Sequence, residues 1–123
     1  MKTIESQDDI IVLVDTFYQK VNKDELLSPI FNNIEKVHWE SHMPTMYAFW
    51  GSILLGTGTY SGRPFPKHLS LPIKQEDFYR WLLLFHTNID EQFSGDLAKE
   101  AKTRASTIAQ IFISKIKSIK GEL

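Results

Sequence analysis

The sequence contains no cysteine, and this absence removes several kinds of chemistry at once. Disulfides, iron–sulfur clusters held by protein thiolates and the C-x-x-C-H attachment of c-type haem are all excluded. Any bound metal must therefore be held by histidine, carboxylate, tyrosine or methionine side chains.

Neither sign of charge predominates, because 14 Lys and Arg residues stand against 15 Asp and Glu residues, a formal net charge of -1. This balance provides no general field to attract nucleic acid or an anionic membrane, so we expect no nucleic-acid partner. No apolar run approaches the roughly 20 residues needed to cross a bilayer. The polar start MKTIESQDD also lacks the apolar stretch of a secretory signal. We therefore expect no membrane segment and a cytoplasmic location.

The hydrophobic residues that are present recur at helical spacing. The 123 residues suit a single domain, which we expect to span residues 1–123. The predicted helices cover about residues 7–21, 37–55, 75–93 and 97–121. Ser6 followed by Asp9 resembles a capping box at the start of the first helix. Hairpin-like alternation is missing, so we predict an all-α fold with no sheet.

Prolines interrupt this helical pattern at three places. Ser28-Pro29 precedes a predicted corner, in which the proline starts a single turn at residues 30–33. Pro44 is tolerable in the first turn of its helix and otherwise predicts a kink near residue 40. The stretch RPFPKHLSLP at 63–72 leaves room for only one short turn, at about residues 66–70.

Polar side chains with a hydrogen-bonding tip stand on the apolar faces. Tyr18 and His42 lie on two helices, and His68 is mounted between the prolines of the stiff loop. A single buried histidine is more often a hydrogen-bonded structural residue than a metal ligand, and aromatic stripes usually pack as core. Together with the indole N–H of Trp81, however, these side chains could converge on one cavity around a planar cofactor such as haem.

Five ordered pieces of the chain carry a family resemblance. They are FYQKV at 17–21, PIF at 29–31, HMPTMYAFW at 42–50, LLGTGTYSGRPFPKHLSLP at 54–72 and RWLLLF at 80–85. The run H-x-P-x-M-x-x-F-W followed by Y-x-G-x-P-x-x-x-H-x-x-L is specific as an ordered pair. With these motifs the chain resembles a truncated haemoglobin, most of all the third of the three groups. The glycine-pair motifs of the other two groups are missing, since the first glycine is Gly51.

The resemblance implies a truncated globin fold, a short helical sandwich around non-covalent haem b. His68 would be the proximal iron ligand, and Phe31 would wedge against the porphyrin. The residues implied on the distal, ligand-binding side are Tyr18, His42, Met46 and Trp81. The residues expected to contact the haem are Phe31, Phe49, Arg63, Lys67, His68, Leu71, Phe78, Ile108 and Phe112. Arg63 and Lys67 would pair with the haem propionates. His42 could donate to a ligand, act as a gate or bind the iron as sixth ligand.

The implied function is reversible binding of diatomic ligands, namely oxygen, carbon monoxide or nitric oxide. Peroxidase or nitric-oxide dioxygenase activity, and a reductase partner, are compatible with the same residues. We expect a monomer.

Two other interpretations stay open. Glu35, His38 and His42 could hold a non-haem metal on one helix face, although H-W-E-S-H is not the zinc-protease pattern H-E-x-x-H. A metal-free helical sensor or partner-binding domain would explain the aromatic residues on the helix faces. It would not explain the positions of the polar groups of Tyr18, His42, His68 and Trp81. His86 is expected to have a helix-surface or helix-packing role, and the dispersed basic residues of the last helix are expected to form a solvated face.

Overall fold

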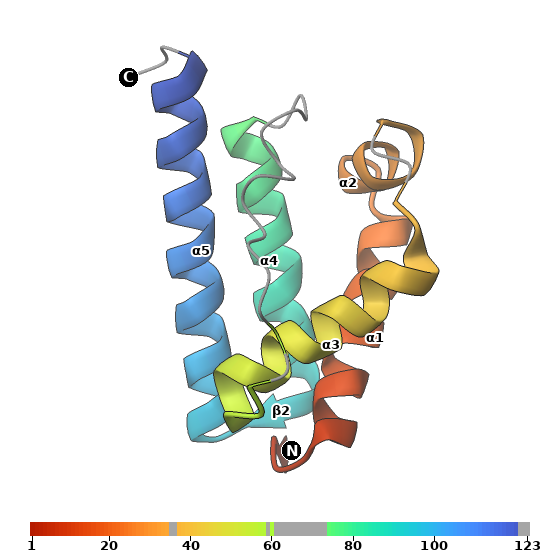
Figure 1. The fold of residues 1–123 in the computed structure, drawn as a ribbon, viewed down its shortest axis with the longest axis vertical. Helices are drawn as coiled ribbons and strands as arrows, with labels where there is room; N and C mark the ends of the chain where they lie inside the picture. The colour runs from red at the N-terminus through yellow and green to blue at the C-terminus, as the bar shows by residue number, and fades with distance from the viewer. Residues whose placement is uncertain (35–36, 59, 61–73, 121–123) are drawn as a thin grey trace.

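The computed structural model describes residues 1–34, 37–58, 60 and 74–120, which form two crossing layers of helices (Figure 1). Helix α1 (Gln7–Lys23) packs against α3 (Trp39–Leu55), which crosses it obliquely. Helices α4 (Gln75–Gln92) and α5 (Asp96–Lys120) lie side by side and run in opposite directions. The predicted helices are all present, within about two residues at each end.

Helix α1 begins where a carboxylate satisfies the first backbone N–H groups. Asp9 Oδ2 accepts hydrogen bonds from the backbone N–H of Glu5 (2.9 Å) and of Ser6 (3.1 Å), as the capping pattern predicted. The side chains that the helix buries recur at three- and four-residue steps and are Ile10, Leu13, Val14, Phe17, Tyr18 and Val21. The spacing of these residues therefore determines which face of α1 meets the core.

The corner after α1 differs in detail from the prediction. It consists of α2 (Leu27–Pro29) and a π-helical turn, η1 (Ile30–Ile34), so that Pro29 closes a helical turn instead of opening one. Asp24 explains the early start, because its Oδ2 accepts the backbone N–H groups of Leu26 (3.1 Å) and Leu27 (2.9 Å). The capping carboxylate, three residues before the first residue of α2, thus outweighs the preference of proline for the first helical position.

Helix α3 contains Pro44 beyond its first turn. The helix starts at Trp39, so Pro44 is its sixth residue and leaves the Glu40 carbonyl without the usual N–H donor four residues on. At the other end, Gly56 takes a left-handed conformation with φ +68° and closes the helix as predicted. The first two turns of α3 are therefore held by fewer internal hydrogen bonds than the rest.

The prediction that the chain has no sheet is wrong in one small respect. Strands β1 (Lys2–Thr3) and β2 (Phe93–Ser94) pair in parallel, with Lys2 opposite Phe93 and Thr3 opposite Ser94. The pair forms because the extended N-terminal residues run beside the turn between α4 and α5, where Gly95 has φ +91°. Two residues are too few for an alternating pattern, so this pairing leaves no sequence signal.

The largest fully buried side chains of the core lie on α1 and α4. They include Ile10, Leu13, Val14, Val21, Phe17, Phe85 and Ile89. One polar group joins them: Asn88 Nδ2 donates to the Leu13 carbonyl at 3.0 Å, so the buried amide is satisfied. None of the helices in the described part of the chain has the length and apolar character needed to span a membrane.

Candidate functional site

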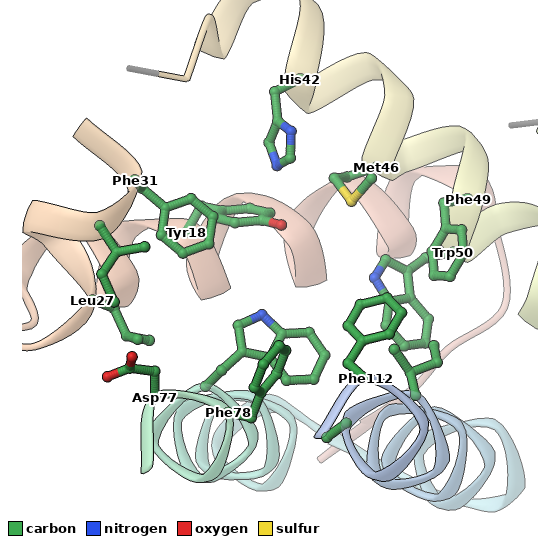
Figure 2. Close-up of a pocket in the computed structure, with 14 residues that line it drawn as sticks. Tyr18, Leu27, Phe31, His42, Met46, Phe49, Trp50, Asp77, Phe78 and Phe112 are labelled. Atoms are coloured by element: carbon green, nitrogen blue, oxygen red, sulfur yellow. The ribbon is translucent and has the colours of Figure 1, made fainter. Parts of the chain in front are cut away.

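A cavity of about 840 Å³, including the part that opens to solvent, lies between α1, the corner, α3, α4 and α5 (Figure 2). The described residues that line it are Tyr18, Leu27, Ile30, Phe31, His42, Met46, Phe49, Trp50, Asp77, Phe78, Trp81, Ile108, Ala109 and Phe112. Most are apolar or aromatic, and few polar tips reach the space, which is the composition expected of a cofactor pocket.

The structure brings together nine of the residues that the sequence placed at the site. They are Tyr18, Phe31, His42, Met46, Phe49, Phe78, Trp81, Ile108 and Phe112. They come from five separate elements, so their meeting at one cavity depends on the tertiary fold. Arg63, Lys67, His68 and Leu71 fall in the segment 61–73, outside the described residues, and so does the predicted turn at 66–70.

Tyr18 is the buried phenol of the cavity. Its ring packs edge-on against His42 (ring centroids 5.1 Å apart) and Trp39 (5.4 Å), and Figure 2 shows its hydroxyl directed into the space below His42 and Met46. Burial raises the pKa of Tyr18 above the ordinary value for a phenol. The side chain therefore stays protonated at neutral pH and is available as a hydrogen-bond donor.

Helix α3 supplies the opposite group of side chains. His42 and Met46 are one helical turn apart, and both point into the cavity from this helix (Figure 2). Phe49 and Trp50 continue the same wall by another turn. The hydrophobic spacing that predicted the helix also predicts this shared face.

The floor of the cavity consists of stacked aromatic rings. Trp81 stacks on Phe85 (5.5 Å, 13° between planes), which stacks in turn on Trp50 (4.8 Å, 25°). Phe17 meets both Trp81 (5.7 Å) and Phe85 (5.1 Å) edge-on. Because each ring is held by its neighbours, the position of the Trp81 indole is determined by the core.

An ion pair holds the corner in place relative to α4. Arg80 Nη1 donates to Asp24 Oδ1 at 2.7 Å, while the other oxygen of Asp24 caps the corner helix. Arg80 is adjacent in sequence to Trp81, and the corner carries Leu27 and Phe31. This contact therefore links two walls of the cavity.

Five lining residues were not singled out from the sequence: Leu27, Ile30, Trp50, Asp77 and Ala109. Trp50 could have been found, since it lies four residues after Met46 on one helix face. Asp77 is a buried carboxylate that accepts the backbone N–H of Lys74 (2.8 Å) at the start of α4. Its position marks a helix cap, and only the fold shows that it borders the cavity.

The two remaining described histidines have other surroundings. His86 Nε2 lies 3.2 Å from both the Lys102 carbonyl and Ser106 Oγ, so it joins α4 to α5, as predicted. His38 is exposed at the start of α3. Within the described ranges, no three His, Asp or Glu side chains gather in a way that could hold a metal ion, although Glu35 lies outside those ranges.

These residues suit a non-covalently bound planar tetrapyrrole. Aromatic and aliphatic side chains on facing elements offer apolar contact to a flat ring, and the chain has no cysteine for covalent attachment. A phenol and an imidazole reach into the same space from α1 and α3. Donors of this kind in a haem pocket decide whether a gas ligand is retained or released.

Comparison with known proteins agrees with this geometry. Residues 2–113 match the family model of the bacterial-like globins. The chain is 39% identical over 111 residues to "Group 3 truncated hemoglobin ctb" of Campylobacter jejuni, covering 87% of each chain. It is 34% identical over 76 residues to "Group 1 truncated hemoglobin GlbN" of a Nostoc species, covering 61% of this chain and 62% of that relative.

A solved structure gives the same result for the fold. The crystal structure of the group III truncated hemoglobin from Campylobacter jejuni superposes with a TM-score of 0.84 at 37% identity, covering 94% of this chain and 95% of that one. The chain therefore belongs to the bacterial-like globin family, and within it to the truncated haemoglobins of the third group. It has the truncated globin fold, and it is a haem protein that holds haem b without covalent bonds and takes diatomic gases as ligands.

Proposed function

We propose that this globin retains oxygen or a related diatomic ligand by a hydrogen bond from Tyr18, at a haem whose iron is held by His68. The haem supplies the iron site at which such ligands bind. The observation that carries the proposal is the buried, protonated phenol of Tyr18, directed into the cavity beside His42. The prolines on both sides of His68 in the sequence favour it as the proximal ligand, because proline restricts the conformations open to the backbone.

Trp81 and His42 have secondary roles in this proposal. The Trp81 indole, fixed by its stack on Phe85, would assist as a second donor. The His42 imidazole faces Tyr18 and would act as a donor or gate, or occupy the sixth coordination position. Phe31, Phe49, Phe78, Ile108 and Phe112 provide apolar contact to the macrocycle, and Arg63, Lys67 and Leu71 complete the proposed haem contacts.

A globin that releases its bound oxygen slowly is better suited to chemical reaction of that oxygen than to oxygen transport. We infer peroxide or nitric-oxide chemistry on this basis, with a reductase as the electron donor needed for repeated turnover. The protein is proposed to act as a monomer in the cytoplasm, and residues 1–123 as a single domain.

The Tyr18→Phe variant tests the central contact. Removing the phenolic O–H should raise the oxygen dissociation rate of the haem-loaded protein by about tenfold, since a net hydrogen bond is worth about 1 kcal/mol or somewhat more. Stopped-flow displacement of oxygen by carbon monoxide gives this rate. Tyr79→Phe, at an exposed tyrosine on α4, is the matched control and should leave the rate unchanged. An unchanged rate in Tyr18→Phe would mean that the phenol does not touch the ligand.

A further inference from the structure

The start of α3 is held in place by a side-chain hydrogen bond from outside the cavity. Trp39 Nε1–H donates to Asn32 Oδ1 at 2.8 Å, which joins the first residue of α3 to the η1 turn. The Trp39 ring also stacks on Phe31, with centroids 6.0 Å apart and planes 20° apart. Trp39 thus contacts the corner through both its polar and its apolar atoms.

The side-chain amide of Asn32 is held in one orientation by hydrogen bonds of its own, so its oxygen is positioned to accept the bond from Trp39. Its Nδ2 donates to Asn22 Oδ1 (2.8 Å) and to the Ser28 carbonyl (3.1 Å). The amide is therefore oriented with its oxygen toward Trp39. The result is a chain of hydrogen bonds from the last turn of α1 through the corner to α3.

Trp39 also forms the outer wall behind the two polar groups of the cavity. Its ring lies edge-on to Tyr18 (5.4 Å) and to His42 (5.5 Å), and His42 follows it by three residues in the same helix. Trp39 is half-buried and is not one of the residues that line the cavity. It touches the proposed ligand-binding residues from the outer side only.

The backbone around His42 gives this contact its importance. Pro44 cannot donate to the Glu40 carbonyl, so the turn that carries His42 has lost one internal hydrogen bond. The backbone N–H groups of Ser41 (3.1 Å) and His42 (2.9 Å) bond to the His38 carbonyl within the same turn. These bonds do not connect the turn to the corner, so its position relative to the corner rests on tertiary contacts. One such contact, one turn before His42, is the hydrogen bond from Trp39 to Asn32.

We propose that the Trp39–Asn32 hydrogen bond is a latch that holds His42 facing the cavity, so that Trp39 is a positioning residue for the gate. Breaking the latch frees the first turn of α3 and lets the imidazole leave the ligand side. The inference rests on the proposed function, in which His42 stands beside the ligand. It assigns the control of that side chain to two residues that never touch the haem cavity.

Trp39→Phe and Asn32→Ala test the latch in the haem-loaded protein. Trp39→Phe keeps an aromatic ring but loses the N–H donor, while Asn32→Ala removes the acceptor. Each variant removes the Trp39–Asn32 hydrogen bond, so the ratio of outward to inward His42 should rise by about two- to tenfold. Asn32→Ala also removes the bonds that Asn32 Nδ2 donates to Asn22 and Ser28, which Trp39→Phe leaves in place. Recombination of carbon monoxide after flash photolysis resolves the two populations as fast and slow phases, and the infrared C–O stretching bands report them independently.

Non-additivity separates a latch from general loosening. The Trp39→Phe/Asn32→Ala double variant should show no larger shift than Asn32→Ala alone, because both substitutions remove the same Trp39–Asn32 bond. In a His42→Leu background, Trp39→Phe should no longer alter recombination. Asn32→Asp keeps the acceptor oxygen and should retain most of the inward population. Gln7→Ala, which removes the 3.2 Å bond from Gln7 Nε2 to the Tyr47 carbonyl farther along α3, is the control and should leave the ratio unchanged.

The outcomes distinguish the latch from the function on which it rests. If His42→Leu changes recombination while Trp39→Phe and Asn32→Ala leave it unchanged, the latch is refuted and the proposed pocket stands. If His42→Leu itself has no effect, His42 is not beside the ligand, and both proposals fail at this residue. Circular dichroism identifies any variant that does not fold, and Asn32→Ala, at an exposed side chain, provides the test if Trp39→Phe is lost.

Discussion

The two ends of the helical sandwich differ sharply, although α1, α4 and α5 run through both. At the end near the strand pair, the closed end, the core is filled by Ile10, Leu13, Val14 and Ile89, which have no more than 1% of their surface exposed. At the other end, the cavity end, the same helices and α3 enclose the cavity. One set of helices therefore provides a packed core at one end and a ligand site at the other.

Side-chain size along α5 shows how this difference arises. Ala98, Ala101 and Ala105 are buried near the closed end, and small side chains let helices approach closely. Farther along α5, Ile108 and Phe112 face the cavity, and Phe112 meets Phe78 of α4 edge-on at 5.8 Å. Phe112 and Phe78 pack against each other between α5 and α4, and the cavity for a flat ligand lies beside them. Stability and ligand binding are thus expected to depend on different residues.

The largest expected effect belongs to the cavity end. His68→Ala should abolish stable haem binding, because no other imidazole in the chain is mounted by prolines in this way. The purified variant should show no Soret band after incubation with hemin. His86→Ala, at the histidine that joins α4 to α5, should keep its haem. A Soret band of unchanged position and intensity in His68→Ala would exclude this residue as the iron ligand.

A matched pair of leucine substitutions tests the division between the two ends. Leu13 is 0% exposed inside the packed core, whereas Leu27 is 2% exposed and borders the cavity. Leu13→Ala should lower the free energy of unfolding by about 4 kcal/mol and Leu27→Ala by about 2 kcal/mol, since the cost grows with the void left behind. Urea denaturation of the haem-loaded protein gives both values.

The rate of haem loss should separate the same two variants in the opposite sense. Leu27→Ala should accelerate transfer of haem to an acceptor protein, and Leu13→Ala should leave that rate close to that of the parent. If both variants lost haem equally fast, the closed end would be supporting the cavity directly, and the two ends would not be independent.

The smallest effect is expected at a contact between α1 and α3. The Tyr47 hydroxyl donates to Asp15, and this hydrogen bond together with burial raises the pKa of Tyr47 to about 12. The folded protein therefore keeps a proton that the unfolded chain releases above about pH 10, and this part of the stability is lost between about pH 10 and about pH 12. Tyr47→Phe should cost about 1 kcal/mol at pH 8, a difference that shrinks toward pH 12 in chemical denaturation. A difference independent of pH would contradict the assigned hydrogen bond.

Much of this arrangement was predictable from periodicity and motifs. The three- and four-residue steps from Val14 to Phe17 and Tyr18 predicted the buried face of α1. The spacing of His42, Met46 and Phe49 predicted one face of α3. The family resemblance, which rested on ordered motifs, was confirmed by the comparisons. The corner was predicted, but its start was not, because the Asp24 cap was not weighed against the preference of Pro29. The two-residue strand pair and the place of Asp77 beside the cavity were not predictable, because each depends on segments far apart in the chain.

The sequence by itself determined the helices, their buried faces and which polar side chains lie on those faces, since these follow from local spacing and from residue type. Only the tertiary structure decided that Tyr18, His42 and Trp81 share one cavity, and that Trp39 and Asn32 meet behind it. The physical reason is that such contacts depend on how helices cross. Helix crossing is set by the packing of many side chains together and cannot be read from any one segment.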